Sequence, residues 1–468
     1  MSIPDSVDVV VLGAGIAGHC CAFTAAEHGA SVLLLEKAQQ FGGSTASGPG
    51  SFAFAATPLQ KQLGIVDSLA LLKSDLIEAG GGKAREDLVD AYVELQLATY
   101  EWMVSLGFQF ERVEASTYQS VPRSHPISGA HVVKVLNEMF LAKPRAAFAS
   151  GARGLSLERD AGGRVAHVRY SQAGSERRVA VKGGVVICTG GFARSDRLIE
   201  KFAPEFVNSV RMGGVANEGD GLLMAWSLGA DVADTGWLSG TFGASLNHYP
   251  DITDRSGQGC ILMHPIFKGG IAVNRNAQRF ADESGSYKAT GRLCLDQPDG
   301  VAFQVFDQDT MDASVPGMMP RDFRAGFDKG LVRTADTIAS LAQTVGLDAA
   351  ALEATLTRYN GFVAAGHDAE FGRTHQIGEI GELKPIARAP FYIYPCTTAL
   401  LSTYGGLAVD ARTRVLDVYG QAIPGLYAAG EVTGGLHGAA YLSGSSLAKG
   451  AIFGRLAGAN AARAAANQ

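Results

Sequence analysis

Residues 7–18 read Val7-Asp-Val-Val-Val-Leu-Gly13-Ala-Gly15-Ile-Ala-Gly18, an apolar run that breaks into glycines. The run is long enough for a buried parallel strand. The glycines allow a tight turn, close approach of the backbone to a pyrophosphate, and close packing of the following helix. A second apolar run, Ser31 to Leu35, ends at Glu36. Strand, glycine turn, helix and acid at this spacing predict a dinucleotide-binding βαβ unit.

Each part of this unit has an expected role in binding. The free N–H groups and the dipole at the start of the helix favour a phosphate there. Glu36, at the tip of the second strand, is placed to accept hydrogen bonds from ribose hydroxyls, and its charge disfavours a 2′-phosphate. The alternative is a tight βα turn that binds nothing.

The composition narrows the class of protein. A chain of 468 residues exceeds one ordinary core, so two or more domains are expected. The net charge of −6 gives no reason to expect a nucleic-acid partner. Charge or glycine interrupts every apolar run within fewer than about 18 residues, so no membrane span is predicted. No basic segment precedes an apolar one at the start, which favours a cytoplasmic protein over a secreted one.

The six cysteines show no Cys-x-x-Cys spacing, and we predict buried thiols without a bound metal. Periodicity predicts helices over residues 68–79, 85–106, 334–345 and 349–365, and a glycine-rich loop over 42–48. The fold class expected is α/β, with a discontinuous Rossmann-like nucleotide domain over 1–236 and 403–468. An α+β capping domain is expected over 237–402, with the active site between the two.

Several blocks in order along the chain resemble the flavoprotein family of fumarate reductases, succinate dehydrogenases and 3-ketosteroid dehydrogenases. The most specific block is Ile423-Pro-Gly-Leu-Tyr-Ala-Ala-Gly-Glu-Val-Thr-Gly-Gly. The others are Gly13-Ala-Gly-Ile-Ala-Gly, Glu36-Lys, Gly42-Gly-Ser-Thr-Ala, Cys188-Thr-Gly-Gly-Phe-Ala, Gly219-Asp-Gly and Val273-Asn-Arg-Asn-Ala-Gln-Arg-Phe.

The resemblance implies FAD as the cofactor, with Glu431 near its ribityl chain. It also implies that the final helix, beginning near residue 445, directs its amino end at the flavin, where its dipole would stabilise the reduced anion. Residues 42–50 contain no histidine for a covalent bond, so the FAD is expected to be non-covalent. The expected cofactor residues are Gly13, Gly15, Ile16, Ala17, Gly18, Glu36, Lys37, Gly43, Ser44, Thr45, Thr189, Gly190, Gly191, Gly219, Asp220, Gly430, Glu431, Ser445, Ser446 and Leu447.

The chain departs from the fumarate reductases where they bind a dicarboxylate. That chemistry uses arginine and histidine, because two carboxylates must be neutralised and a carbanion protonated. When this chain is compared with that pattern, the cationic positions become Tyr441, Ser402, Tyr287 and Met311.

The Tyr441-x-Ser443 pattern resembles the 3-ketosteroid 4-ene (5α) dehydrogenases, in which both hydroxyls face the substrate. The expected catalytic residues are therefore Tyr441 and Ser443, followed by Tyr404 and Tyr287. Substrate contacts are expected from Ser402 and from Arg123 and His125 in a polar loop. His437 is expected either to hydrogen-bond the cofactor or to be structural.

The resemblance implies a dehydrogenase that introduces a C=C bond next to the carbonyl of a ketosteroid or a smaller cyclic ketone. A first alternative is a fumarate reductase-like or tricarballylate dehydrogenase-like enzyme, in which Arg292 would pair with a substrate carboxylate. A second alternative is a non-catalytic flavin-fold binding protein. The chain has no haem attachment, Fe–S spacing or second dinucleotide motif, so an external electron acceptor is expected.

Overall fold

The computed structural model describes residues 4–48, 50–377 and 380–467, which fold into two compact units. Unit 1 consists of residues 1–203, 213–238 and 402–468, and unit 2 of residues 204–212 and 239–401. Segment 204–212 differs from the predicted division. It belongs to unit 2 because strand β9 (Val210–Arg211) pairs in parallel with β17 (Phe391–Thr403).

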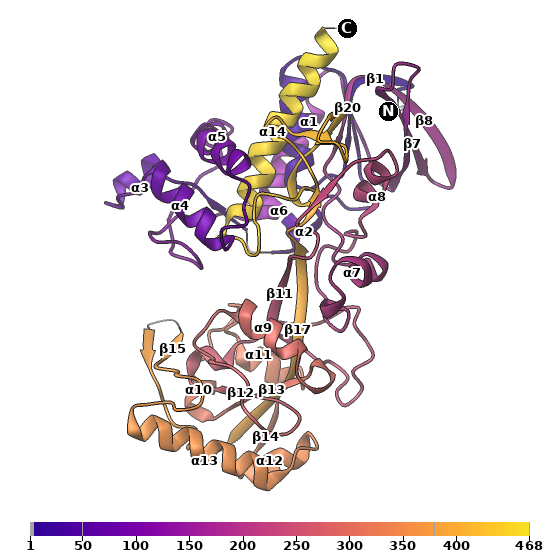
Figure 1. Cartoon of the computed structure of the whole chain (residues 1–468). Coiled ribbons are helices and arrows are strands. Elements are labelled where there is room, and N and C mark those ends of the chain that lie inside the picture. The colour runs from indigo at the N-terminus through magenta and orange to yellow at the C-terminus, as the bar shows by residue number, and fades with distance from the viewer. Residues whose placement is uncertain (1–3, 49, 378–379, 468) are drawn as a thin grey trace. The chain divides into compact units, whose positions relative to one another are not determined.

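Unit 1 is built on a sheet with the strand order β19-β20-β8-β1-β2-β5, and β7 and β6 continue from β8 (Figure 1). The central pairs β20–β8, β8–β1, β1–β2 and β2–β5 are parallel. The bounds are β1 Ser6–Leu12, β2 Val32–Leu35, β5 Ala146–Ala149, β6 Ala152–Arg159, β7 Val165–Gln172, β8 Ser175–Ile187, β19 Arg414–Leu416 and β20 Ala422–Ala428. The smaller pairs are β3 (Ser51–Ala53) with β4 (Ser124–Pro126), and β10 (Val232–Ala233) with β18 (Gly406–Leu407).

The β1 strand is almost entirely aliphatic because it is buried on both faces, as parallel strands covered by helices are. Helix α1 follows it and packs along α14, the last helix of the chain (Figure 1). The helices of unit 1 are α1 Ile16–Glu27, α2 Gly43–Ser47, α3 Pro58–Gln62, α4 Leu69–Ala79, α5 Glu86–Ser105, α6 Gly129–Leu141, α7 Asp196–Phe202, α8 Asp220–Trp226 and α14 Ser445–Ala466, with a 3₁₀ turn at Gly430–Val432.

The predicted loop over 42–48 contains a helix instead. Residues 43–47 form α2, because Gly42 at φ +112° and Gly43 at φ +48° turn the chain and the small residues that follow fit one helical turn. The helices predicted over 68–79 and 85–106 are confirmed as α4 and α5.

Unit 2 has a sheet with the strand order β11-β17-β13-β12, and β14 and β9 also pair with β17. Its strands are β11 Leu238–Ser245, whose first residue belongs to unit 1, β12 Ile271–Val273, β13 Ala302–Phe306, β14 Arg333–Ala335, β15 His375–Ile377, β16 Ile380–Glu382, β9 and β17. Its helices are α9 Tyr287–Leu295, α10 Gln308–Asp312, α11 Phe323–Asp328, α12 Ile338–Thr344 and α13 Ala349–Ala365, with 3₁₀ turns at Pro204–Phe206, Pro265–Lys268 and Pro298–Gly300.

The core of unit 2 lies where α12 and α13 pack against this sheet. Leu352 and Leu356 of α13 are buried with Phe303 and Ile393 of the strands. The helix predicted over 349–365 is confirmed, whereas the one predicted over 334–345 begins four residues late. Residues 333–335 pair with β17 as strand β14, because tertiary pairing there overrides the local helical pattern.

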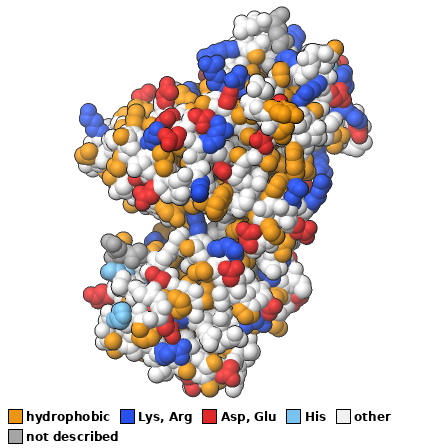
Figure 2. All heavy atoms as spheres, in the orientation of Figure 1, with side chains coloured by type: hydrophobic (Ala, Val, Ile, Leu, Met, Phe, Trp, Pro, Cys, Tyr) orange, Lys and Arg blue, Asp and Glu red, His pale blue; other side chains and the backbone are white. Residues whose placement is uncertain are grey.

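The distribution of charged side chains and the state of the cysteines can be read from the structure. Figure 2 shows acidic and basic side chains interspersed with hydrophobic ones over the visible face of each unit. All six thiols are free, and each except the half-buried Cys260 is buried. In the described part of the chain, no helix has the length and apolar character needed to span a bilayer, and no cluster of three or more His, Cys, Asp or Glu side chains suits a metal ion.

Candidate cofactor and active site

The glycine turn between β1 and α1 is shaped by contacts that exclude a side chain. Gly13 has φ +98°, and a Cβ there would overlap the carbonyl group of Cys188 at the end of β8. A Cβ on Gly18 would overlap the carbonyl oxygen of Gly13. Helix α1 starts after Gly15, which supplies no side-chain cap, so first-turn N–H groups beyond that of Ile16 can bind an anion.

Glu36 is fixed at the carboxyl end of β2, beside this turn. Its buried carboxylate accepts hydrogen bonds from the N–H groups of Ala14 and Ala38, both at 2.8 Å. Two N–H bonds leave lone pairs on both oxygens, because a carboxylate can accept about four hydrogen bonds. The geometry is compatible with the expected contact to a ribose.

Lys37 and Asp220 also lie close together, although they are far apart in sequence. The Lys37 ammonium is 2.8 Å from the Asp220 carboxylate, which also accepts a 2.8 Å bond from Arg153. Burial opposes ionisation of Asp220, but hydrogen bonds from Lys37 and Arg153 hold the pKa of this carboxyl below its usual value. Both residues are thus already engaged in an ion-pair network. Gly219, which precedes α8, has φ +79°.

Helix α2 carries two predicted hydroxyls, one bound to the start of α1 and the other to residues 214–217. Thr45 Oγ1 accepts a 3.2 Å bond from the N–H of Ile16, at the start of α1. Ser44 Oγ accepts bonds from Asn217 Nδ2 and the N–H of Gly214, both at 3.2 Å. Asn217 was missed by the sequence analysis because it lies outside the Gly-Asp-Gly motif that it precedes.

Asn217 also binds the buried acid of the carboxyl-terminal motif. Its Nδ2 donates to one oxygen of Glu431 and the N–H of Thr403 donates to the other, both at 3.1 Å. Burial raises the pKa of Glu431. A Cβ on Gly191 would lie 2.6 Å from a Glu431 oxygen, so only glycine fits beside this acid. Gly190 and Gly430 have φ of +74° and +83°, which also favour glycine.

The amino end of α14 resembles that of α1. The helix begins after Gly444, at φ +86°, without a side-chain cap, whereas Ser68 and Ser128 cap α4 and α6. Ser445 is buried and its hydroxyl binds none of the described residues, which is also true of Thr189 Oγ1. A buried hydroxyl without a partner is costly, so both atoms fit a polar ligand. Ser446 is exposed and Leu447 half-buried, and each offers the ligand a first-turn N–H.

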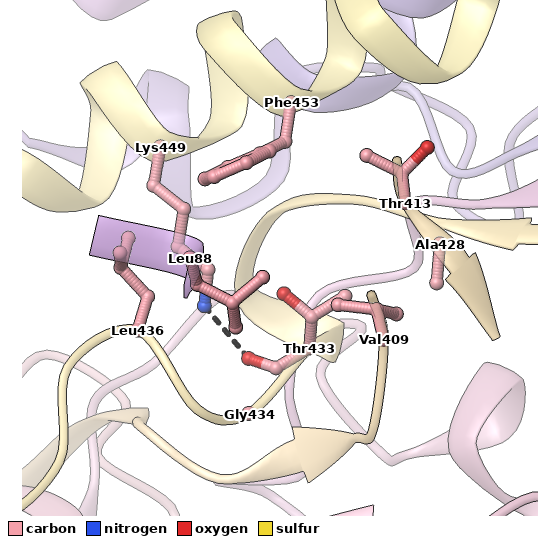
Figure 3. Close-up of a pocket in the computed structure, with 9 residues that line it drawn as sticks. All are labelled: Leu88, Val409, Thr413, Ala428, Thr433, Gly434, Leu436, Lys449 and Phe453. Atoms are coloured by element: carbon pink, nitrogen blue, oxygen red, sulfur yellow. Dashed lines mark hydrogen bonds between the residues drawn. The ribbon is translucent and has the colours of Figure 1, made fainter. Parts of the chain in front are cut away.

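One turn further along α14, Lys449 is buried beside a small cavity (Figure 3). Its ammonium donates a 2.7 Å bond to the carbonyl oxygen of Thr433, at the end of the carboxyl-terminal motif. Burial lowers the pKa of Lys449 to about 8, although the negative charge of Glu431 opposes the shift. The cavity is lined by Leu88, Val409, Thr413, Ala428, Thr433, Gly434, Leu436, Lys449 and Phe453.

Three predicted residues of unit 1 form an aromatic cluster. The ring centres of Tyr404, His437 and Tyr441 lie 5.6 to 5.9 Å from one another. Tyr404 is buried and Tyr441 half-buried. The structure therefore brings Tyr441 and Tyr404 together just before α14 begins.

The other predicted hydroxyl residues are not part of this aromatic cluster. Ser443 is half-buried, two residues after Tyr441, and Ser402 is half-buried in β17, two residues before Tyr404. Tyr287 is the first residue of α9 in unit 2, where its ring stacks on that of His264 with centres 5.5 Å apart.

Arg123 and His125, which we expected to contact substrate, are internal instead. The Arg123 guanidinium is fully buried and forms ion pairs with Asp67 (2.7 Å) and Asp75. His125 is buried, with Nε2 3.0 Å from Thr57 Oγ1 and Nδ1 2.8 Å from the carbonyl oxygen of Arg123. Burial lowers the pKa of His125. These contacts engage the polar groups of both side chains within unit 1, and a contact of either residue with substrate stays a prediction.

Arg292, the predicted carboxylate ligand of the alternative function, lies on α9 of unit 2. Its side chain is 46% exposed and pairs with Asp296 at 2.9 Å, one helical turn away. Such i,i+4 pairs are typical of solvated helix faces.

Residues 8–447 match the family model described as FAD binding domain. The chain belongs to this family. It is 30% identical over 469 residues to a cytochrome-type fumarate reductase of Shewanella frigidimarina, a match that covers 98% of this chain and 77% of that protein.

Two solved structures extend the comparison. An open flavocytochrome c3 fumarate reductase superposes with a TM-score of 0.85 at 27% identity, covering 98% of this chain and 79% of that one. The 3-ketosteroid-Δ4-(5α)-dehydrogenase of Rhodococcus jostii RHA1 superposes with a TM-score of 0.76 at 29% identity, covering 99% and 98%. This family member is an FAD-dependent oxidoreductase, and the predictions of family, fold class and cofactor are confirmed.

Proposed function

We propose that this flavoprotein dehydrogenates a saturated ketone next to its carbonyl group, with a 3-ketosteroid or smaller cyclic ketone as substrate. The observation that carries the proposal is the cluster of Tyr404, His437 and Tyr441, with Ser443 two residues further on, at the uncapped start of α14. Its hydroxyls suit a neutral carbonyl oxygen better than a carboxylate.

The proposed reaction removes two hydrogens from adjacent carbons. The carbon next to the carbonyl loses a proton, and the electron pair left on this carbon forms the C=C bond as the following carbon loses a hydride. FAD, when bound, supplies the hydride acceptor, and an external electron acceptor then reoxidises it.

The side chains have separate roles in this proposal. The Tyr441 phenol donates a hydrogen bond to the ketone oxygen, which acidifies the adjacent carbon. The Ser443 hydroxyl, or a water molecule, takes the released proton. Tyr404 packs against Tyr441 at 5.6 Å and limits the orientations of its ring. Ser402 stays a candidate for a substrate contact, and Tyr287 stays a candidate catalytic residue.

A carboxylate substrate is the second candidate, since the relative from S. frigidimarina is a fumarate reductase. Arg255 of unit 2 favours it, because its Nη1 is buried and binds none of the described residues. Burial, and then the charge of Arg211, lower the pKa of Arg255, although the charge of Asp299 opposes the shift. Arg123 and Arg292, in contrast, already have carboxylate partners.

The test is anaerobic bleaching of the flavin absorbance by a panel of saturated ketones and carboxylic acids. We expect a ketone to bleach it, and Tyr441→Phe to slow bleaching by roughly 100-fold while FAD stays bound. The control is Tyr419→Phe, since Tyr419 is 84% exposed. Acid precipitation should release the FAD, because no covalent bond is expected.

The outcomes distinguish the ketone reaction from the carboxylate reaction and from a non-catalytic protein. Bleaching by a carboxylic acid alone, with a loss of rate in Arg255→Leu, would transfer the assignment to the carboxylate reaction. Bleaching of Tyr441→Phe at the rate of Tyr419→Phe would remove the role of Tyr441. A purified protein without flavin absorbance would support the non-catalytic alternative.

A further inference from the structure

The segment that carries Ser443 is held on one side by a single loop, residues 116–124. Gln119 Nε2 donates a 2.8 Å hydrogen bond to the carbonyl oxygen of Ser443. The N–H of Ser443 donates a 3.1 Å bond to the carbonyl oxygen of Thr117. Both backbone polar groups of Ser443 are therefore bound by this loop.

The Gln119 amide is held in one orientation. Its Oε1 accepts bonds from the N–H groups of Ser116 and Arg123, both at 3.1 Å, and its Nε2 also donates to Ser124 Oγ at 2.9 Å. Two N–H donors face the oxygen, so an exchange of oxygen and nitrogen would leave these donors facing an NH₂ group. The donor toward Ser443 is thus fixed by the loop itself.

Internal contacts hold the loop in turn. Asp75 of α4 accepts 2.8 Å bonds from the N–H and hydroxyl of Ser120, and it also pairs with Arg123. On the other side of the segment, the N–H of Ala53 in β3 donates a 3.1 Å bond to the carbonyl oxygen of Gly444. A Cβ on Gly444 would lie 2.9 Å from this nitrogen, so the segment packs directly against β3.

We propose that Gln119 is a positioning residue for Ser443 in the dehydrogenation. The proposal rests on the function proposed above. Gln119 fixes the peptide of Ser443, and thereby the place of the hydroxyl that takes the proton. A misplacement of about 1 Å can cost a factor of 10² in rate, so a remote amide can have a large effect.

The test variant is Gln119→Glu in the FAD-bound protein. It keeps the shape and the acceptor oxygen but replaces the donor with an oxygen that faces the Ser443 carbonyl. We expect flavin bleaching by the ketone to slow about tenfold or more, with the FAD dissociation constant and the thermal midpoint unchanged. If the charged variant does not fold, Gln119→Met replaces it in the test, because methionine has neither the donor nor the acceptor of the amide. The matched control is Gln109→Glu, at an exposed position that precedes the same loop.

A double-mutant cycle with Ser443→Ala distinguishes positioning from general damage. If Gln119 acts through Ser443, the Gln119→Glu change should slow the Ser443→Ala enzyme less than about twofold. Independent, multiplying effects would overturn the proposal, and so would a Gln119→Glu rate equal to that of the control.

A second readout does not depend on substrate. Hydrogen exchange followed by mass spectrometry should show faster exchange at residues 441–445 in Gln119→Glu than in Gln109→Glu. Loss of the Gln119 bond to the Ser443 carbonyl oxygen should let the segment open more often, and each opening exposes the Ser443 N–H that otherwise binds Thr117. Faster exchange without any ketone activity in the native protein would refute the proposed function but support the contact. Unchanged exchange would overturn the positioning role itself.

Discussion

The carboxylate of Glu36 accepts a 2.8 Å hydrogen bond from the backbone N–H of Ala14, which ties the tip of β2 to the turn that follows β1. Its other oxygen binds the N–H of Ala38 at the same distance. The acid is therefore oriented by the backbone before any ligand arrives. Bonds from N–H groups to a carboxylate are charge-assisted, so this arrangement depends on the full negative charge.

We expect Glu36→Gln to weaken FAD binding by about 10- to 100-fold, because one backbone N–H would face an NH₂ group and a charge-assisted bond contributes roughly 1.5–3 kcal/mol. Titration of the apoprotein with FAD, followed by flavin fluorescence, measures the change. The exposed Glu111→Gln serves as the control. Equal dissociation constants for the two variants would show that Glu36 does not contribute to binding.

The buried Lys449 predicts a pH dependence of stability. Its pKa is about 8 in the folded protein, against the ordinary value of 10.5. Between these values the unfolded chain binds the proton and the folded chain does not, so this lysine makes the free energy of unfolding rise with pH from about 8 to 10.5. Below pH 8 both states are protonated, and its contribution is constant.

Urea unfolding of the holoprotein at pH 7, 8, 9 and 10 measures this effect as the difference between wild type and Lys449→Met. The difference should change in favour of the wild type above pH 8, by up to about 1.4 kcal/mol per pH unit. The exposed Lys61→Met should give a curve parallel to the wild type. A parallel curve for Lys449→Met would show that Lys449 keeps its proton throughout.

The internal ion pairs of Arg123 predict a large loss of stability on substitution. Arg123→Met would leave the carboxylates of Asp67 and Asp75 buried without their cation, at a cost of about 3–5 kcal/mol. The control is Arg112→Met, which removes an exposed pair with Glu114 and should cost about 0–1 kcal/mol. Urea midpoints that shift equally in the two variants would contradict the assignment.

Local sequence was sufficient for the cofactor half of the fold. The run over residues 7–18 and Glu36 determine strand, turn and helix through steric and capping rules that act over a few residues. In unit 2, α13 likewise follows its apolar period over 349–365. Local sequence patterns gave the wrong element where a strand pairs with a strand far away in the sequence. Thr334 joins β14 because it faces Tyr392 of β17, and no helical period can show that partner.

The same distinction explains which contacts of the candidate site were not predicted from the sequence. Arg123 lies in a polar loop and was expected to bind substrate, but its partners Asp67 and Asp75 precede it by 56 and 48 residues. Gln119 belongs to no motif, and its partner Ser443 is 324 residues away. Contacts of this kind become visible only when the chain is folded.

Small residues of α14 meet the backbone of α1. A Cβ on Gly454 would overlap the carbonyl oxygen of Ala17, and one on Gly458 would overlap that of Cys21. At these two glycines the main chain of α14 packs directly on the main chain of α1, without a side chain of α14 between them. This packing fixes the separation of the two uncapped helix starts, so the donors expected to meet the pyrophosphate and the flavin are already arranged by folding. Little conformational entropy then remains to be lost when the ligand binds.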